Sequence, residues 1–79
     1  MEIDQQKLDE CALAILSLTL HGDKYGLRAW KGLDWDVMDR LFEKGWIGDP
    51  KGKAKSVVFT DEGVERANEF LQVHFGRPG

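Results

Sequence analysis

The sequence predicts an α+β domain of three helices and a small antiparallel sheet, in the order helix, strand, helix, β-hairpin, helix. Three segments carry apolar residues at the three- and four-residue steps of a helix, and they follow the good N-cap residues Asp4, Asp34 and Thr60. Short runs rich in aromatic or β-branched residues lie between them, and the last two such runs flank a turn that contains Pro50 and Gly52.

Length and composition are those of a single small domain over residues 1–79, with 76–79 as a frayed tail. A chain of this size buries only about 60% of the surface that its unfolded form exposes, so its core is marginal. With Cys11 as its one cysteine, an acidic N-terminal segment unlike a signal peptide and no apolar run of membrane-spanning length, we expect a cytoplasmic protein.

The first helix is expected to run from Asp4 to about His21 and to end at Gly22. Ile3 and Leu8 have the spacing of a hydrophobic staple around the Asp4 cap. One stripe of residues recurs at helical spacing and is predicted to be buried: Leu8, Cys11, Ala12, Ile15, Leu18 and Thr19.

A short strand is predicted over residues 27–30, after turn residues 21–26, and the second helix follows the Asp34 cap. Its predicted buried face consists of Val37, Met38, Leu41 and Phe42. Gly45 is placed to take the left-handed conformation that ends a helix, which lets Trp46 pack back on Leu41.

The hairpin is predicted from strands at 46–47 and 55–59 around the loop 49–53, and the third helix follows the Thr60 cap. Taken together, the periodic positions predict a core of Leu8, Ala12, Ile15, Leu18, Val37, Leu41, Ile47, Val57, Phe59, Val64, Ala67 and Leu71.

Two stretches carry a resemblance to winged-helix proteins. Residues 39–47, DRLFEKGWI, resemble the end of a winged-helix recognition helix where it enters the first wing strand, and residues 55–63, KSVVFTDEG, resemble the second wing strand leading through "L-T-x-x-G" into a final helix. The chain also resembles a family of short uncharacterised bacterial proteins with a domain of unknown function, through RAWKGLDW at 28–35 and DPKGKAKSVV at 49–58. The resemblance implies a trimmed winged helix, because residues 31–33 leave no room for the extra helix that completes a DNA-binding helix-turn-helix.

Charge is distributed unevenly along the chain, whose net charge is −3. Residues 24–55 hold eight basic and five acidic side chains, while the segments before and after them are acidic. The candidate nucleic-acid contacts lie in this middle segment: Arg28, Lys31, Lys51, Lys53 and Lys55. A solvated loop, in which lysines also protect a strand edge, is the favoured interpretation of the three wing lysines.

The second helix is expected to disfavour major-groove binding. Between Asp34 and Lys44 it holds four acids and two bases, so its outward face has the wrong sign for a phosphate-lined groove. Asp36 and Arg40 have the spacing of an ion pair within the helix.

Trp30 and Trp35 are candidate interface residues, because large aromatic side chains dominate binding hot spots; completion of the small core is the alternative for both. Cys11 is expected to be a small buried hydrophobe, and His21 and His74 to be helix-end groups. With no nucleophile, phosphate loop or metal-ligand spacing, we expect no enzymatic activity, no cofactor and no metal.

The sequence therefore predicts an interaction module that binds a partner protein or a second copy of itself as a homodimer, through the first helix, the third helix or the Trp30/Trp35 surface. The alternative is a regulator that contacts duplex DNA phosphates through a basic wing. Neither a membrane nor a small-molecule substrate is expected as a partner.

Overall fold

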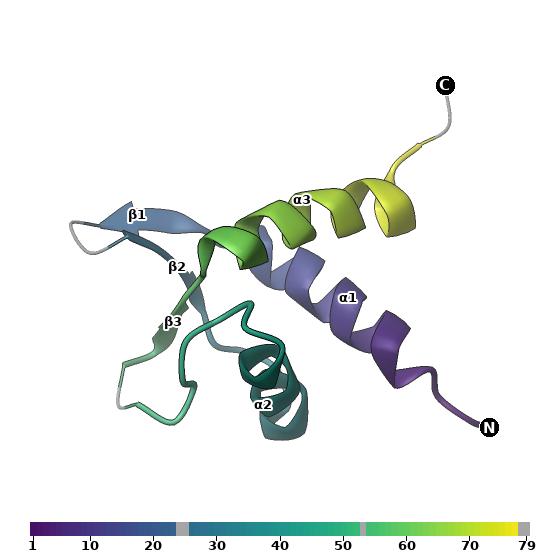
Figure 1. The fold of residues 1–79 in the computed structure, drawn as a ribbon, viewed down its shortest axis with the longest axis horizontal. Helices are drawn as coiled ribbons and strands as arrows, with labels where there is room; N and C mark the ends of the chain where they lie inside the picture. The colour runs from purple at the N-terminus through teal and green to yellow at the C-terminus, as the bar shows by residue number, and fades with distance from the viewer. Residues whose placement is uncertain (24–25, 53, 78–79) are drawn as a thin grey trace.

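The computed structural model describes residues 1–23, 26–52 and 54–77. Along the chain it contains α1 (Gln5–Ser17), β1 (His21–Asp23), β2 (Gly26–Trp30), α2 (Trp35–Glu43), β3 (Ser56–Val58) and α3 (Asp61–Phe75). In Figure 1 the sheet lies on the left, α2 lies below, and α1 and α3 extend to the right toward the two ends of the chain.

The sheet is antiparallel in the order β1-β2-β3, with β2 in the centre. Arg28 lies opposite both His21 on β1 and Val58 on β3. A single bridge between Ile47 and Phe59, together with a 2.8 Å bond from the Gly48 N–H to the Val58 carbonyl, forms the hairpin predicted after α2. The predicted α+β class and its helix, strand, helix, hairpin, helix order are confirmed.

The end of the first helix differs from the prediction, since α1 stops at Ser17 rather than near His21. Hydroxyl groups explain the early end. Ser17 and Thr19 donate to the carbonyls of Ala14 and Leu16, and such local bonds compete with the helical ladder. The Thr19 hydroxyl also accepts the Trp30 N–H at 3.1 Å. Because α1 ends early and Thr19 is bonded to Trp30, residues 21–23 lie beside β2 and form the edge strand β1. These residues were predicted as a turn.

The end of α2 has the predicted geometry. Gly45 has a φ of 78°, its N–H bonds the Phe42 carbonyl at 2.9 Å, and the Trp46 N–H bonds the Leu41 carbonyl at 3.1 Å. These two bonds form a Schellman motif, which turns Trp46 back toward the core. The Trp46 ring then packs edge-on against Phe70 of α3, with ring centroids 5.4 Å apart.

The core lies between the helices and the inner face of the sheet. It consists of Ala12, Leu13, Ala14, Leu16, Ala29, Val37, Met38, Leu41, Ile47, Val57, Phe59, Ala67 and Phe70. The prediction was wrong for Leu8, Ile15 and Leu18, which are exposed, and for Phe42, which is exposed on α2. Val64 and Leu71 are partly buried against the core. On α1 the buried face carries Leu13 and Leu16 together with Ala12 of the predicted stripe.

The principal extents of the domain are 37 × 32 × 18 Å. α1 packs against α3, α2 and β2. Its outer residues Leu8 and Ile15, with Leu18 at its end, remain exposed.

We expect Thr60→Val to destabilise the domain by about 1–2 kcal/mol, as measured by urea unfolding. The Thr60 hydroxyl accepts the Gly63 N–H at 2.9 Å and donates to the Gly45 carbonyl at 2.7 Å, so it caps α3 and ties it to the end of α2. Valine keeps the shape and removes both bonds. Thr60→Ser keeps the hydroxyl and serves as the control; equal stability of the Val and Ser variants would contradict this role.

Candidate functional site

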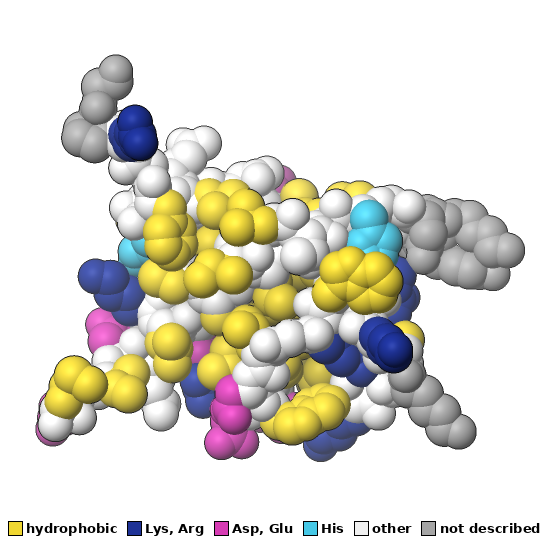
Figure 2. Space-filling model, turned by 180° about the vertical axis from the view of Figure 1, so that it is seen from behind, with side chains coloured by type: hydrophobic (Ala, Val, Ile, Leu, Met, Phe, Trp, Pro, Cys, Tyr) yellow, Lys and Arg dark blue, Asp and Glu magenta, His cyan; other side chains and the backbone are white. Residues whose placement is uncertain are grey.

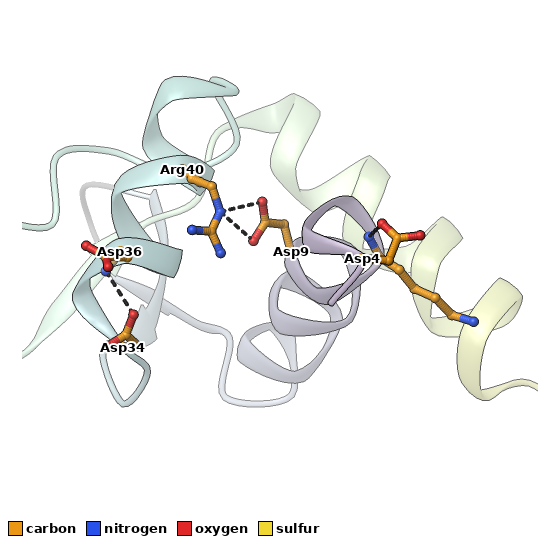
Figure 3. A network of polar contacts seen from close by, with 6 residues as sticks. Asp4, Asp9, Asp34, Asp36 and Arg40 are labelled. Carbon is orange, nitrogen blue, oxygen red and sulfur yellow. Dashed lines mark hydrogen bonds and ion pairs between the residues drawn. The ribbon is translucent and has the colours of Figure 1, made fainter. Parts of the chain in front are cut away.

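Two ionic contacts join α1 to the neighbouring helices. Arg40 of α2 places its Nε within 3.0 Å of both carboxylate oxygens of Asp9, whose side chain is almost fully buried (Figure 3). The hydrogen bond to Asp9 raises the pKa of Arg40 above its ordinary value. Arg40 was expected to pair with Asp36 on its own helix; instead it spans to α1, because Asp9 lies buried directly across the interface.

The second contact joins His74 near the end of α3 to Glu10 of α1, with 2.8 Å between Nε2 and Oε1. His74 lies in the last turn of α3, as its prediction as a helix-end group requires. Both side chains are largely buried, so His74 is part of the α1–α3 interface rather than of the surface. Each of these two contacts joins α1 to another helix, and the side chains that form it already have their partners within the domain.

The predicted nucleic-acid residues are only partly brought together. The Arg28 Nε and Nη2 atoms donate to the Ser56 hydroxyl and carbonyl at 2.7 and 2.9 Å. The Lys31 amine donates to the Gly52 carbonyl at 2.8 Å, and the Lys31 N–H donates to the Lys55 carbonyl at 2.9 Å. Arg28, Lys31 and Lys55 therefore lie around β2 and β3.

The remaining wing lysines contribute less to this cluster. Lys51 is exposed, and its N–H donates to the Asp49 carboxylate in a local turn. Lys53 lies outside the described residues, as do residues 78 and 79 of the predicted tail; residues 76 and 77 lie beyond the end of α3.

Both candidate interface tryptophans are more than half exposed. The Trp30 ring stacks on the His21 ring, with centroids 4.9 Å apart and an angle of 29° between the planes. Trp35 has the Lys31 amine 5.8 Å from its ring centroid. The interface prediction needs exposed tryptophans, and the structure exposes both.

The first helix was one of the self-association surfaces expected from the sequence, although its stripe of apolar residues was predicted to be buried. Leu8, Cys11 and Ile15 of α1 and Leu18 at its C-cap are here named the α1 stripe, and all but the half-buried Cys11 are exposed. Figure 2, viewed from behind, shows hydrophobic side chains gathered over the middle of the face that α1 crosses, with most charged side chains toward its margins. The available signal in the sequence was that α1 carries apolar residues on more than one face.

Within residues 1–23, 26–52 and 54–77, no group of three or more His, Cys, Asp or Glu side chains is placed to share a metal ion. The helices of that same part of the chain are all too short or too polar to cross a bilayer.

Comparisons with known proteins agree on one family. A family model described as "Domain of unknown function (DUF6429)" matches residues 4–77. A protein of Sinorhizobium fredii (strain NBRC 101917 / NGR234), described as uncharacterized protein y4hR, is 51% identical over 77 residues, which make up 98% of this chain and all of that protein. No solved structure matches the chain. The winged-helix resemblance stays a prediction.

Proposed function

Because the chain belongs to the DUF6429 family of unknown function, its role has to be inferred from its surface, and we propose that it is a non-enzymatic interaction module that self-associates through the α1 stripe. The observation that carries the proposal is an uncharged, exposed face on a helix whose opposite face already forms the core. The occupant we propose for this face is a second copy of the chain.

The spacing of the α1 stripe suits helix-on-helix packing. Leu8, Cys11, Ile15 and Leu18 follow one another at steps of three, four and three residues, the repeat of a coiled-coil seam. A helix with apolar residues on both faces is normally buried on both. In this domain the inner face packs on the core, and the outer face would pack on a partner helix.

Charge favours an antiparallel, two-fold arrangement. In that geometry Leu8 of one copy meets Leu18 of the other, and every pairing along the α1 stripe is apolar. The acidic residues Glu2 and Asp4, which precede the first turn of α1, then lie near the opposite end of the second helix. A parallel pair would bring the two acidic starts together, which costs free energy.

We expect the wild-type protein to form a dimer and Ile15→Glu to shift its dissociation constant upward by about a hundredfold or more. A two-fold interface places the new carboxylate in the apolar seam twice, and like charges brought together there are strongly unfavourable. Sedimentation velocity over a wide range of protein concentrations measures the shift.

Val73→Glu is the matched control for this experiment. Val73 is also a β-branched residue exposed on a helix, but it lies on α3 outside the α1 stripe. This variant should dimerise like the wild type. A wild type that is monomeric at every concentration, or equal effects of the two substitutions, would contradict the proposal.

The alternative function, a duplex-DNA regulator that uses a basic wing, has weaker support. Arg28 and Lys31 already donate to Ser56 and Gly52. Arg40 pairs with Asp9 of α1, so only one of the two basic side chains of α2 remains to balance the acidic side chains on its outward face. That face would repel the phosphates that line a major groove.

A further inference from the structure

His21 and Trp30, here named the aromatic pair, lie at the end of α1 that approaches the sheet. The Thr19 hydroxyl accepts the Trp30 N–H at 3.1 Å, and the Thr19 carbonyl lies 3.0 Å from the His21 Nδ1. The two rings stack with their centroids 4.9 Å apart. Thr19 directly follows Leu18, the last residue of the α1 stripe, so the aromatic pair is tied to the chain immediately beyond that stripe.

Apolar side chains are uncovered at both ends of α1. Trp30 is 54% exposed although its ring stacks on His21. At the other end, Met1 and Ile3 precede the Asp4 cap, and each exposes more than half of its surface. In Figure 1 the sheet and the N-terminus lie at opposite ends of α1, and Figure 2 shows hydrophobic side chains spread between these ends. Such a distribution suits a two-fold partner, whose own helix end would meet the opposite end of the first helix.

We infer that residues 1–4, here named the arm, pack on the aromatic pair of a second copy of the chain, an inference that rests on the proposed dimer through the α1 stripe. In the antiparallel arrangement Leu8 of one copy meets Leu18 of the other. The arm of the first copy then continues past Leu18 to the aromatic pair of the second. A two-fold axis makes each copy supply one arm and one aromatic pair.

The arm cannot reach the aromatic pair of its own chain. α1 has 13 residues, and at about 1.5 Å per residue its two ends are ~20 Å apart. The arm leaves α1 at the end remote from Trp30, and four fully extended residues span at most about 14 Å. Of the two arms in a dimer, only the arm of the other copy can therefore cover the aromatic pair. The contact is an exchange of arms between copies.

The small area of the α1 stripe gives a second reason for this contact. Complete burial of a Leu or Ile side chain removes on the order of 100 Å² of apolar surface from water. The partly exposed Leu8, Ile15 and Leu18 together offer less than about 300 Å². Each partner in a standard interface contributes about 800 Å², of which more than half is apolar. The arm and the aromatic pair supply further apolar surface at both ends of the stripe, which a stable dimer needs.

Sedimentation velocity of the full chain tests this contact through Trp30→Ala and Ile3→Ala. We expect the first variant to raise the dimer dissociation constant about thirtyfold and the second about tenfold, as for anchoring residues of an interface. Neither side chain belongs to the core, so both variants should keep the wild-type circular dichroism spectrum. Trp35, 58% exposed at the start of α2, is the matched control, and Trp35→Ala should dimerise like the wild type.

A mixture of Trp30→Ala and Ile3→Ala tests whether the contact joins two copies. Each homodimer is weakened at both contacts, whereas the heterodimer keeps one intact contact, between the arm of the Trp30→Ala chain and the aromatic pair of the Ile3→Ala chain. The mixture should therefore contain more dimer than either variant alone at the same total concentration.

Three outcomes would overturn the inference: wild-type dimerisation of both variants, a mixture no more dimeric than its components, or equal effects of Trp30→Ala and Trp35→Ala. A dimer that depends on Ile15 but not on Trp30 or Ile3 would leave the proposed function standing without this contact. A monomeric wild type would contradict both proposals.

Discussion

Arg40→Met is expected to cause the largest loss of stability of any single substitution considered for this chain. It leaves the Asp9 carboxylate, which is 1% exposed, without the cation that neutralises it between α1 and α2. A buried charge that loses its partner costs about 3–5 kcal/mol. Thermal unfolding followed by circular dichroism should show a fall in Tm of well over 10 °C, since each kcal/mol shifts a domain of this size by about 4–8 °C.

The double variant Asp9→Leu with Arg40→Met provides the control. Replacing a buried ion pair by apolar side chains of similar volume is often neutral or stabilising, so the second substitution should restore most of the lost stability. Such a recovery shows that the cost of Arg40→Met comes from the unpaired carboxylate rather than from lost packing. A double variant as unstable as Arg40→Met alone would assign the effect to packing of the Arg40 stem instead.

Local signals explain why the fold class was predictable. The caps at Asp4, Asp34 and Thr60 each accept a backbone N–H of the following turn, and Gly45 ends α2 as its place in the sequence predicts. These features depend on residues within four positions of one another. Short-range chemistry of this kind is present in the sequence and changes little with the surrounding fold.

The face of α1 that packs inward was not predictable by the same reasoning. Both faces are apolar, so the three- and four-residue periodicity selects either the stripe with Leu8 and Ile15 or the face with Leu13 and Leu16. In the structure the face that packs inward carries Asp9, whose carboxylate pairs with Arg40 of α2. The sequence alone does not show that Asp9 faces inward, because its partner Arg40 lies on a different helix.

The candidate sites depended on contacts between distant segments. Exposure of Trp30 and Trp35 follows from the position of β2 between two other strands and of α2 beside it, which the sequence did not reveal. The stacking of Trp30 on His21 requires β1, an element predicted as a turn. The sequence thus indicated the right aromatic and basic residues without showing which of them lie together.

Gly63→Ala is expected to destabilise the domain by about 3 kcal/mol or more, which reverses the usual sign of this substitution. In an ordinary helix interior alanine is more stable than glycine by about 1 kcal/mol. Gly63 is the third residue of α3, and a methyl group there would lie 2.8 Å from the Trp46 carbonyl carbon and closer still to its oxygen. Overpacking against backbone atoms costs roughly 3 kcal/mol at the upper end of its common range.

The Trp46 carbonyl cannot easily move away from that methyl group, because it accepts the Thr60 N–H at 3.1 Å and follows the Schellman end of α2. The glycine of the T-x-x-G pattern at residues 60–63 therefore has a packing role, since it lets α3 begin directly on the chain that leaves α2. Gly52→Ala is the control, because an added Cβ at that position meets no atom within 4 Å. When both glycine variants are unfolded in urea, Gly52→Ala should change the free energy of unfolding by less than about 0.5 kcal/mol. If Gly63→Ala instead raised stability, as helix propensity alone predicts, the close contact of α3 with the Trp46 carbonyl would be wrong. The position of α3 against α1, which includes the contact between His74 and Glu10, would then be in question too.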